Sequence, residues 1–160
     1  MDVNPVPPEF HSVTPYLFVR GAIKAIDWYG KAFNATEVCR FPFPDGEKLM
    51  HAEIEIGDSR VMLTDENVDM HAPSPDHLGG CSASFLIYVE NVDEMFGQAI
   101  AAGGEVVRPV ADQFYGDRSG CLKDPFGHMW TISTHVEDVS DEEMEKRMAA
   151  MSSDAPNQDA

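Results

Sequence analysis

Apolar residues are arranged along the chain in two patterns, short continuous runs and stripes at helical spacing. The segments Tyr16–Val19 and Leu86–Val89 are short runs rich in aromatic and β-branched residues, which is typical of buried strands. Each run is followed by a segment whose apolar residues recur at helical spacing. These stripes consist of Ala22, Ile26, Tyr29 and Phe33 in the first segment, and of Val92, Met95, Phe96, Ala99 and Ile100 in the second. The pattern therefore predicts a strand followed by a helix twice.

The two strand–helix pairs belong to a longer repeat with an offset of 70 residues, from residue 16 to residue 86. The same offset places Gly57 over Gly127, and each glycine opens a turn into a further strand-like segment. Because a repeat in sequence indicates a repeated structural unit, we expect two βαβββ modules. Further strands are predicted at 36–41, 49–56, 59–64, 105–109, 119–123 and 129–133. The predicted fold is α+β, with two βαβββ modules forming a curved mixed sheet around a small-molecule-sized cleft.

The repeat also predicts how the 160 residues are organised, as a single structural domain with flanking segments. Residues 1–10 contain three prolines and are expected to form an extended N-terminal arm. The first module is expected at 11–64, a linker at 65–80 and the second module at 81–135. Residues 136–160 are expected to form an acidic C-terminal helix and tail. Ser140 and Glu143 form a capping box at the start of this helix.

Charge and composition exclude several classes of protein. The net charge is −17 with only 11 Lys and Arg residues, which argues against nucleic acid as a partner. No apolar run approaches the ~18 residues that a membrane span requires, and the N-terminal residues do not resemble a secretion signal. Cys39, Cys81 and Cys121 are odd in number and widely spaced, which suits reduced thiols in the cytoplasm.

Two segments resemble a known family. The segments VTPYLFVRGAIKAIDWYGKAFNATEV and DRSGCLKDPFGHMWTI resemble the glyoxalase/bleomycin-resistance/extradiol-dioxygenase (vicinal oxygen chelate) superfamily. The most specific element is the DPFGH turn at 124–128, and the region from Asp112 to Asp138 is most similar to the PhnB-like branch. The resemblance covers about residues 12 to 135. It implies the paired-module fold, a cleft for a small molecule and a homodimer.

The resemblance also implies a divalent metal held by residues on the first and last strands of each module. Carried onto this sequence, the family's ligand positions are Thr14, Val61, Ser84 and Thr131. Hydroxyls and a valine cannot replace the imidazoles and carboxylates that bind such metals. The sequence therefore predicts no metal and no other cofactor in the usual place, which argues against glyoxalase or dioxygenase chemistry.

A displaced metal site is an alternative. His51, Glu53 and Glu55 share one face of a predicted strand, and His11 could approach from the N-terminal arm. The simpler explanation of the same alternation is that these are polar side chains on the solvent side of the sheet.

Strand alternation predicts which side chains line the cleft. If Thr14 faces the cleft, Tyr16 and Phe18 on the same strand face it too, and Ser84 implies the same for Leu86 and Tyr88. In the same way, Thr131 implies that Met129 and Ser133 face the cleft, and Val61 implies that Leu63 does. Trp130 should face a helix. Tyr115 and Arg118 come from a loop that often closes this cleft, where the arginine either contacts a ligand by a forked contact or orders the loop with Asp117. The alternative for the apolar members is that they pack as core.

Three functions remain open. The first is a metal-independent binding protein of the bleomycin-resistance type, sequestering an aromatic or cationic compound. The second is a glyoxalase-like lyase or isomerase, or a dioxygenase-type enzyme, with a relocated metal site. The third is an interaction module with a vestigial cleft.

Overall fold

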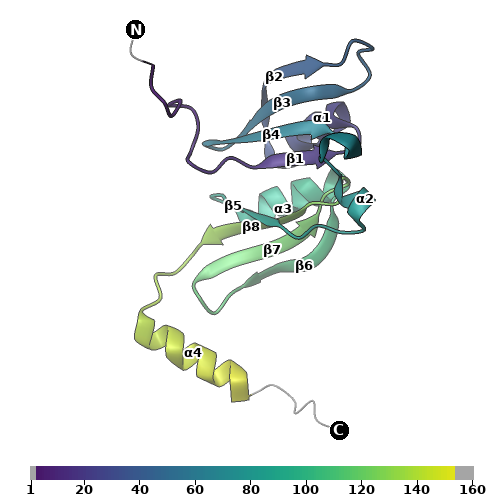
Figure 1. Ribbon diagram of the computed structural model, residues 1–160. Coiled ribbons are helices and arrows are strands. Elements are labelled where there is room, and N and C mark those ends of the chain that lie inside the picture. Colours follow the sequence, from purple (N-terminus) through teal and green to yellow (C-terminus); the bar gives the residue numbers. More distant parts are fainter. Residues whose placement is uncertain (1–2, 154–160) are drawn as a thin grey trace.

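The computed structural model describes residues 3–153 as two βαβββ modules (Figure 1). The first module contains β1 (Tyr16–Val19), α1 (Ala22–Phe33), β2 (Thr36–Pro42), β3 (Leu49–Ile56) and β4 (Ser59–Asp65). The second contains β5 (Ser84–Tyr88), α3 (Val92–Ala101), β6 (Glu105–Asp112), β7 (Asp117–Lys123) and β8 (Met129–His135). The predicted α+β fold of two βαβββ modules is confirmed.

Each module builds its own four-stranded sheet with one parallel pair. The strand orders are β1-β4-β3-β2 and β5-β8-β7-β6, with β1 parallel to β4 and β5 parallel to β8. The edge strands β1 and β5 lie next to each other in Figure 1, without pairing between them among the described strands. The expected curved sheet is thus divided into two sheets along this boundary.

The segment between the modules and the two ends of the chain carry short elements. The expected linker contains η1 (Val68–Met70) and α2 (Pro75–Leu78). The acidic helix is present as α4 (Asp141–Ser153), and the Glu143 N–H donates to Ser140 Oγ as the capping box predicts. Arg147 of α4 contacts Glu137 and the Phe114 carbonyl, which docks the helix on the β6–β7 turn. Residues 1–2 and 154–160 of the expected arm and tail lie outside the described residues.

The last strand of each module holds the start of that module's helix. In the first module the Asp65 carboxylate accepts hydrogen bonds from the N–H groups of Gly21 and Ala22, at 2.8 and 3.1 Å. In the second, Thr134 Oγ1 accepts from the Val92 N–H at 2.9 Å. The first N–H groups of a helix lack partners within the helix, so a polar side chain at this point satisfies them.

The two modules share one hydrophobic core on the helix-covered faces of their sheets. Trp130 of β8 packs against Phe33 and Tyr29 of α1, with ring centroids 5.0 and 5.6 Å apart. Trp28 Nε1 donates to the carbonyl of Ala102, which follows α3. The prediction that Trp130 faces a helix is confirmed, and the aromatic contacts explain why the modules form one body.

The strand register corrects two predicted cleft residues. Tyr16 pairs with Met62, whereas Leu86 pairs with Thr131, so β1 and β5 are related by 70 residues but β4 and β8 by 69. The chain from Tyr16 to Met62 is one residue longer than the chain from Leu86 to Thr131, which shifts β4 by one position relative to β8. A shift of one residue turns a side chain to the other face. Val61 and Leu63, 4% and 0% exposed, therefore face the helix-covered core, and their predicted orientation toward the cleft is wrong.

Candidate functional site

The face of each sheet opposite its helix, called here the open face, carries exposed apolar side chains. Tyr16 of β1 and Leu86 and Tyr88 of β5 are 45%, 53% and 61% exposed. These two strands are the neighbouring edges of the two sheets. Exposed apolar residues that gather at one place mark binding surfaces more often than scattered ones do. The boundary between the modules is therefore the first region to consider for a ligand.

A cavity of about 720 Å³ opens along this boundary. Ligand sites of proteins usually have volumes of about 300–1,000 Å³. One wall comes from β5 and the other from the residues before β1 and the β3–β4 turn. The lining consists of Val13, Pro15, Ile56, Gly57, Asp58, Ser59, Val61, Ser84, Phe85, Leu86, Ile87, Tyr88 and Trp130. It is mostly apolar, with hydroxyl groups and the Asp58 carboxylate as its polar members.

The structure gathers four of the predicted site residues at this cavity. Ser84, Leu86 and Tyr88 line it from β5, and Val61 borders it from the core side. Tyr16 and Phe18 lie on β1 and line two smaller cavities of about 320 and 270 Å³ instead.

The other predicted site residues lie outside this cavity. Met129 and Thr131 are half-buried on β8. Thr14 donates from its hydroxyl to the His11 carbonyl at 3.4 Å. Leu63 is in the core. Ser133, expected beside Thr131, is fully buried, and its hydroxyl donates to Asp117 at 3.0 Å.

Arg118 and Tyr115 lie apart from the cavity. The Arg118 guanidinium makes a forked contact with Asp93 at the start of α3, both distances being 2.7 Å, and reaches Asp112 at 2.9 Å. These carboxylates raise its pKa, first through hydrogen bonds from the guanidinium to Asp93 and Asp112. Tyr115 packs edge-on against Phe114 in the β6–β7 turn. Arg118 thus joins β7 to α3, with its charges already paired.

The family's metal positions do not fit a metal in this structure. The register replaces Val61 by Met62 as the counterpart of Thr131. The four positions are then occupied by Thr14, Met62, Ser84 and Thr131. Hydroxyls and a thioether do not form the imidazole and carboxylate set that holds a catalytic divalent ion. Among the residues considered for a displaced site, His51 Nε2 lies 3.4 Å from Glu53 Oε1. Glu55 instead pairs with Arg60, and His11 lies beside Asp58.

A polar network centred on the buried Asp117 lies at one end of the second open face. The Asp117 carboxylate accepts hydrogen bonds from Tyr88 at 2.8 Å and Ser133 at 3.0 Å, and contacts His135 Nδ1 at 2.9 Å. Burial acts to raise the pKa of Asp117, but the hydrogen bonds from His135, Tyr88 and Ser133 outweigh it and hold the pKa below its usual value. The pKa of His135 is raised by its contacts with Asp138 and Asp117. The network fixes the Tyr88 ring at the edge of the cavity, a role that the sequence did not reveal.

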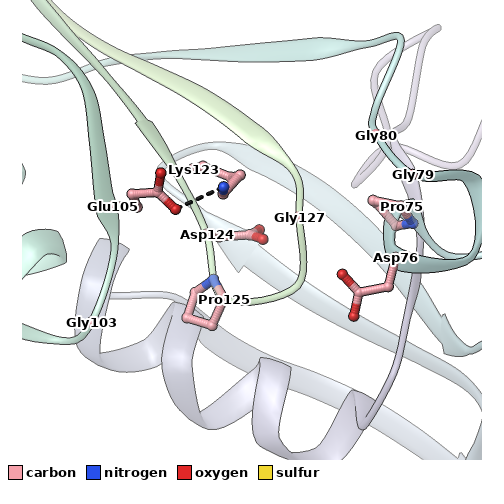
Figure 2. Close-up of a pocket in the computed structure, with 10 residues that line it drawn as sticks. All are labelled: Pro75, Asp76, Gly79, Gly80, Gly103, Glu105, Lys123, Asp124, Pro125 and Gly127. Atoms are coloured by element: carbon pink, nitrogen blue, oxygen red, sulfur yellow. Dashed lines mark ion pairs between the residues drawn. The ribbon is translucent and has the colours of Figure 1, made fainter.

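A second cavity, of about 400 Å³, lies between α2 and the β7–β8 turn (Figure 2). Its walls are largely turns of glycine and proline. Glu105 and Lys123 pair with each other at 2.7 Å, so their charges are satisfied. The Asp124 carboxylate is buried and accepts from the Tyr29 hydroxyl at 2.6 Å and Trp130 Nε1 at 2.9 Å. This cavity offers few groups for a ligand, and Asp124 has a structural role.

The chain matches the family described as the Glyoxalase/Bleomycin resistance protein/Dioxygenase superfamily over residues 10–132. The uncharacterised protein Mb0911c of Mycobacterium bovis is 42% identical over 145 residues, covering 89% of this chain and 93% of the relative. The PhnB protein from Bacillus cereus has a similar structure, with a TM-score of 0.62 at 19% identity over 78% of this chain and 99% of that one. The fosfomycin resistance protein FosX from Listeria monocytogenes has a TM-score of 0.59 at 17% identity, over 84% and 97%. At these identities, the two solved structures establish a shared fold.

Proposed function

Because the chain belongs to the Glyoxalase/Bleomycin resistance protein/Dioxygenase superfamily, we propose that it binds a small organic molecule in the cavity between its modules. The observation that carries the proposal is the cavity of about 720 Å³ beside the exposed Leu86 and Tyr88. An aromatic ring and an aliphatic side chain on one strand favour a flat, partly apolar ligand. FosX, which shares the fold, is described as a fosfomycin resistance protein, and a role in sequestering a toxic small molecule fits the same fold.

The charge of the chain favours a cationic ligand. The net charge is −17, and the Asp58 carboxylate lies on the cavity rim with a highly exposed side chain. A negative surface raises the local concentration of cations and speeds their association. This attraction weakens as salt increases, because the Debye length falls to ~8 Å at physiological ionic strength.

The proposed binding does not use a metal at the family's four positions, since Thr14, Met62, Ser84 and Thr131 do not form a ligand set. The alternative, a glyoxalase-like lyase or isomerase or a dioxygenase-type enzyme, requires a metal at another place. The group of Cys39, His51 and Glu53 in the first module supports that alternative.

Fluorescence titration with two planar dyes tests the proposal. We expect acridine orange, a cation, to bind saturably and more tightly than the anion 8-anilinonaphthalene-1-sulfonate. Leu86→Gln removes apolar contact area without changing the charge and should weaken acridine orange binding about tenfold, as expected from the ~1.5–3 kcal/mol that burial of a leucine contributes. Val38→Gln is the matched control, because Val38 is a similarly exposed apolar residue on β2.

Two results would count against the proposal. Equal weakening by Leu86→Gln and Val38→Gln would show that the dye binds elsewhere or non-specifically. If Leu86→Gln changes the mass of the assembly in solution but leaves the dye affinity unchanged, this surface would instead contact a second copy of the chain.

A further inference from the structure

We propose that Cys39, His51 and Glu53 bind a zinc ion on the open face of the first sheet. Cys39 of β2 pairs with Glu53 of β3, and His51 lies two residues before Glu53 on the same face. One ligand atom from each of the three residues lies within 4.8 Å of the others. Within residues 3–153, no other group of three His, Cys, Asp or Glu side chains meets this condition.

The spacing of the three side chains suits a tetrahedral ion. Zinc bonds of about 2.0–2.3 Å give ligand–ligand distances of roughly 3.3–3.8 Å around a tetrahedron. His51 Nε2 and Glu53 Oε1 are already 3.4 Å apart. Because all three ligand atoms lie within 4.8 Å, a side-chain adjustment of about 1 Å completes the arrangement without a change in the strands.

The imidazole of His51 is held in an orientation that suits a metal ligand. Its Nδ1 lies 2.9 Å from the Tyr16 hydroxyl, while its Nε2 faces Glu53. The ring lies edge-on to Tyr16 and is stacked with Phe41, at centroid distances of 5.5 and 6.2 Å. When Nδ1–H donates to the Tyr16 oxygen, Nε2 keeps its lone pair for the ion. Histidine ligands generally have such a partner on the other nitrogen.

The charges around the group also balance a divalent ion. A Cys39 thiolate and the Glu53 carboxylate together neutralise two positive charges. The side chain of Arg60 is 14% exposed and lies 3.9 Å from Glu53 Oε2, whereas the other carboxylate oxygen, Oε1, faces His51. Thiolate and imidazole favour zinc over magnesium, calcium or manganese. Three protein ligands leave the fourth position for water or a ligand atom.

This group differs from the metal site that the family implies, because it lies on β2 and β3 rather than on β1, β4, β5 and β8. The group also lies outside the cavity between the modules, whose lining includes none of the three residues. The competing explanation is that the three side chains are only the polar side of a sheet. That explanation predicts no metal affinity beyond the background of an acidic protein.

Cobalt titration of the full-length, metal-free protein separates the two explanations. We expect one Co²⁺ to bind per chain with a thiolate-to-cobalt charge-transfer band in the near ultraviolet. Zn²⁺ should displace the cobalt and abolish the band. Cys39→Ser should remove the band, whereas the control Cys81→Ser should keep it, since Cys81 is a half-buried thiol outside the group. Tyr16→Phe removes the hydroxyl that contacts His51 Nδ1 and should weaken binding about 10–100-fold.

Thermal unfolding without metal shows whether each variant is folded. If Cys39→Ser unfolds at a lower temperature than the wild type, His51→Gln and Glu53→Gln supply the test through at least tenfold weaker cobalt binding. The absence of a charge-transfer band at one equivalent of cobalt would overturn the proposal. A band of equal intensity in Cys39→Ser would also overturn it. Neither result would alter acridine orange binding at the other cavity, so the two proposals fail independently.

Discussion

The buried carboxylate of Asp124 joins the two modules, and replacing it by alanine tests this role. The carboxylate accepts four hydrogen bonds, two of them from the N–H groups of Phe126 and His128 in its own turn. The other two come from the Tyr29 hydroxyl of α1 at 2.6 Å and Trp130 Nε1 of β8 at 2.9 Å. Asp124→Ala would leave all four donors without this partner in a buried site.

The number of donors left unpaired sets the expected loss of stability in Asp124→Ala. A buried donor left unpaired costs about 1–3 kcal/mol, and such costs do not add fully. Since water can reach part of the turn, we expect a loss of about 4 kcal/mol in the free energy of unfolding. For a protein of 150–250 residues, 1 kcal/mol lowers the melting temperature by roughly 2–4 °C, which gives a decrease of about 8–16 °C. Tyr29→Phe removes one bond to a charged group, so a loss of about 2 kcal/mol is expected.

Thermal unfolding followed by circular dichroism at pH 7 measures both changes. The matched control is Asp76→Ala, because Asp76 lies across the same cavity from Asp124 but is exposed (Figure 2). Its melting temperature should remain within about 2 °C of the wild type, a shift typical of surface substitutions. A decrease of less than about 2 °C for Asp124→Ala, or an equal decrease for Asp76→Ala, would refute the role assigned to this carboxylate.

Three further substitutions and one solution measurement test other parts of the structure. Val61→Asp should destabilise the protein by about 3–5 kcal/mol because it buries an unpaired charge in the core. Met62→Asp places the charge on the opposite face of β4 and should cost less than about 1 kcal/mol. Equal losses of stability in denaturant unfolding would contradict the register. Hydrogen bonds from Ser74 and Arg20 lower the pKa of Glu66 from 4.5 to about 2. The stability that the Glu66 carboxylate contributes is therefore present above its unfolded-state pKa and is lost as the pH falls through about 2. Glu66→Gln should therefore be less stable than the wild type at pH 7, with the difference shrinking between about pH 5 and pH 2, and a constant difference would contradict this origin. Light scattering tests the homodimer that the family resemblance implies, and a mass of one chain would contradict it.

The repeated pattern of the sequence predicts the fold because it depends on local signals. Apolar runs and helical stripes at Tyr16–Val19, Leu86–Val89 and the segments after them correspond to β1, β5, α1 and α3. The capping box of Ser140 and Glu143 is likewise local and forms at the start of α4. Within the residues described, no helix is long and apolar enough to cross a membrane, as the absence of long apolar runs predicts.

The candidate site was less predictable because it depends on register and on contacts between distant strands. One extra residue between Tyr16 and its strand partner, compared with Leu86 and Thr131, places Met62 rather than Val61 opposite Tyr16. Alternation alone put His51 and Glu53 on one face, but only the pairing of β2 with β3 brings Cys39 beside Glu53. The forked contact of Arg118 with Asp93 joins residues far apart in sequence, so a ligand contact and a structural role looked alike.

Binding of a small molecule between the modules can be located residue by residue with nuclear magnetic resonance. Amide shifts of the ¹⁵N-labelled protein during titration with acridine orange locate the dye on the chain. We predict saturable changes in β5 and in the β3–β4 turn at 57–59, where the cavity of about 720 Å³ opens. Changes confined to the cavity of Figure 2, or no saturable change, would contradict the claim.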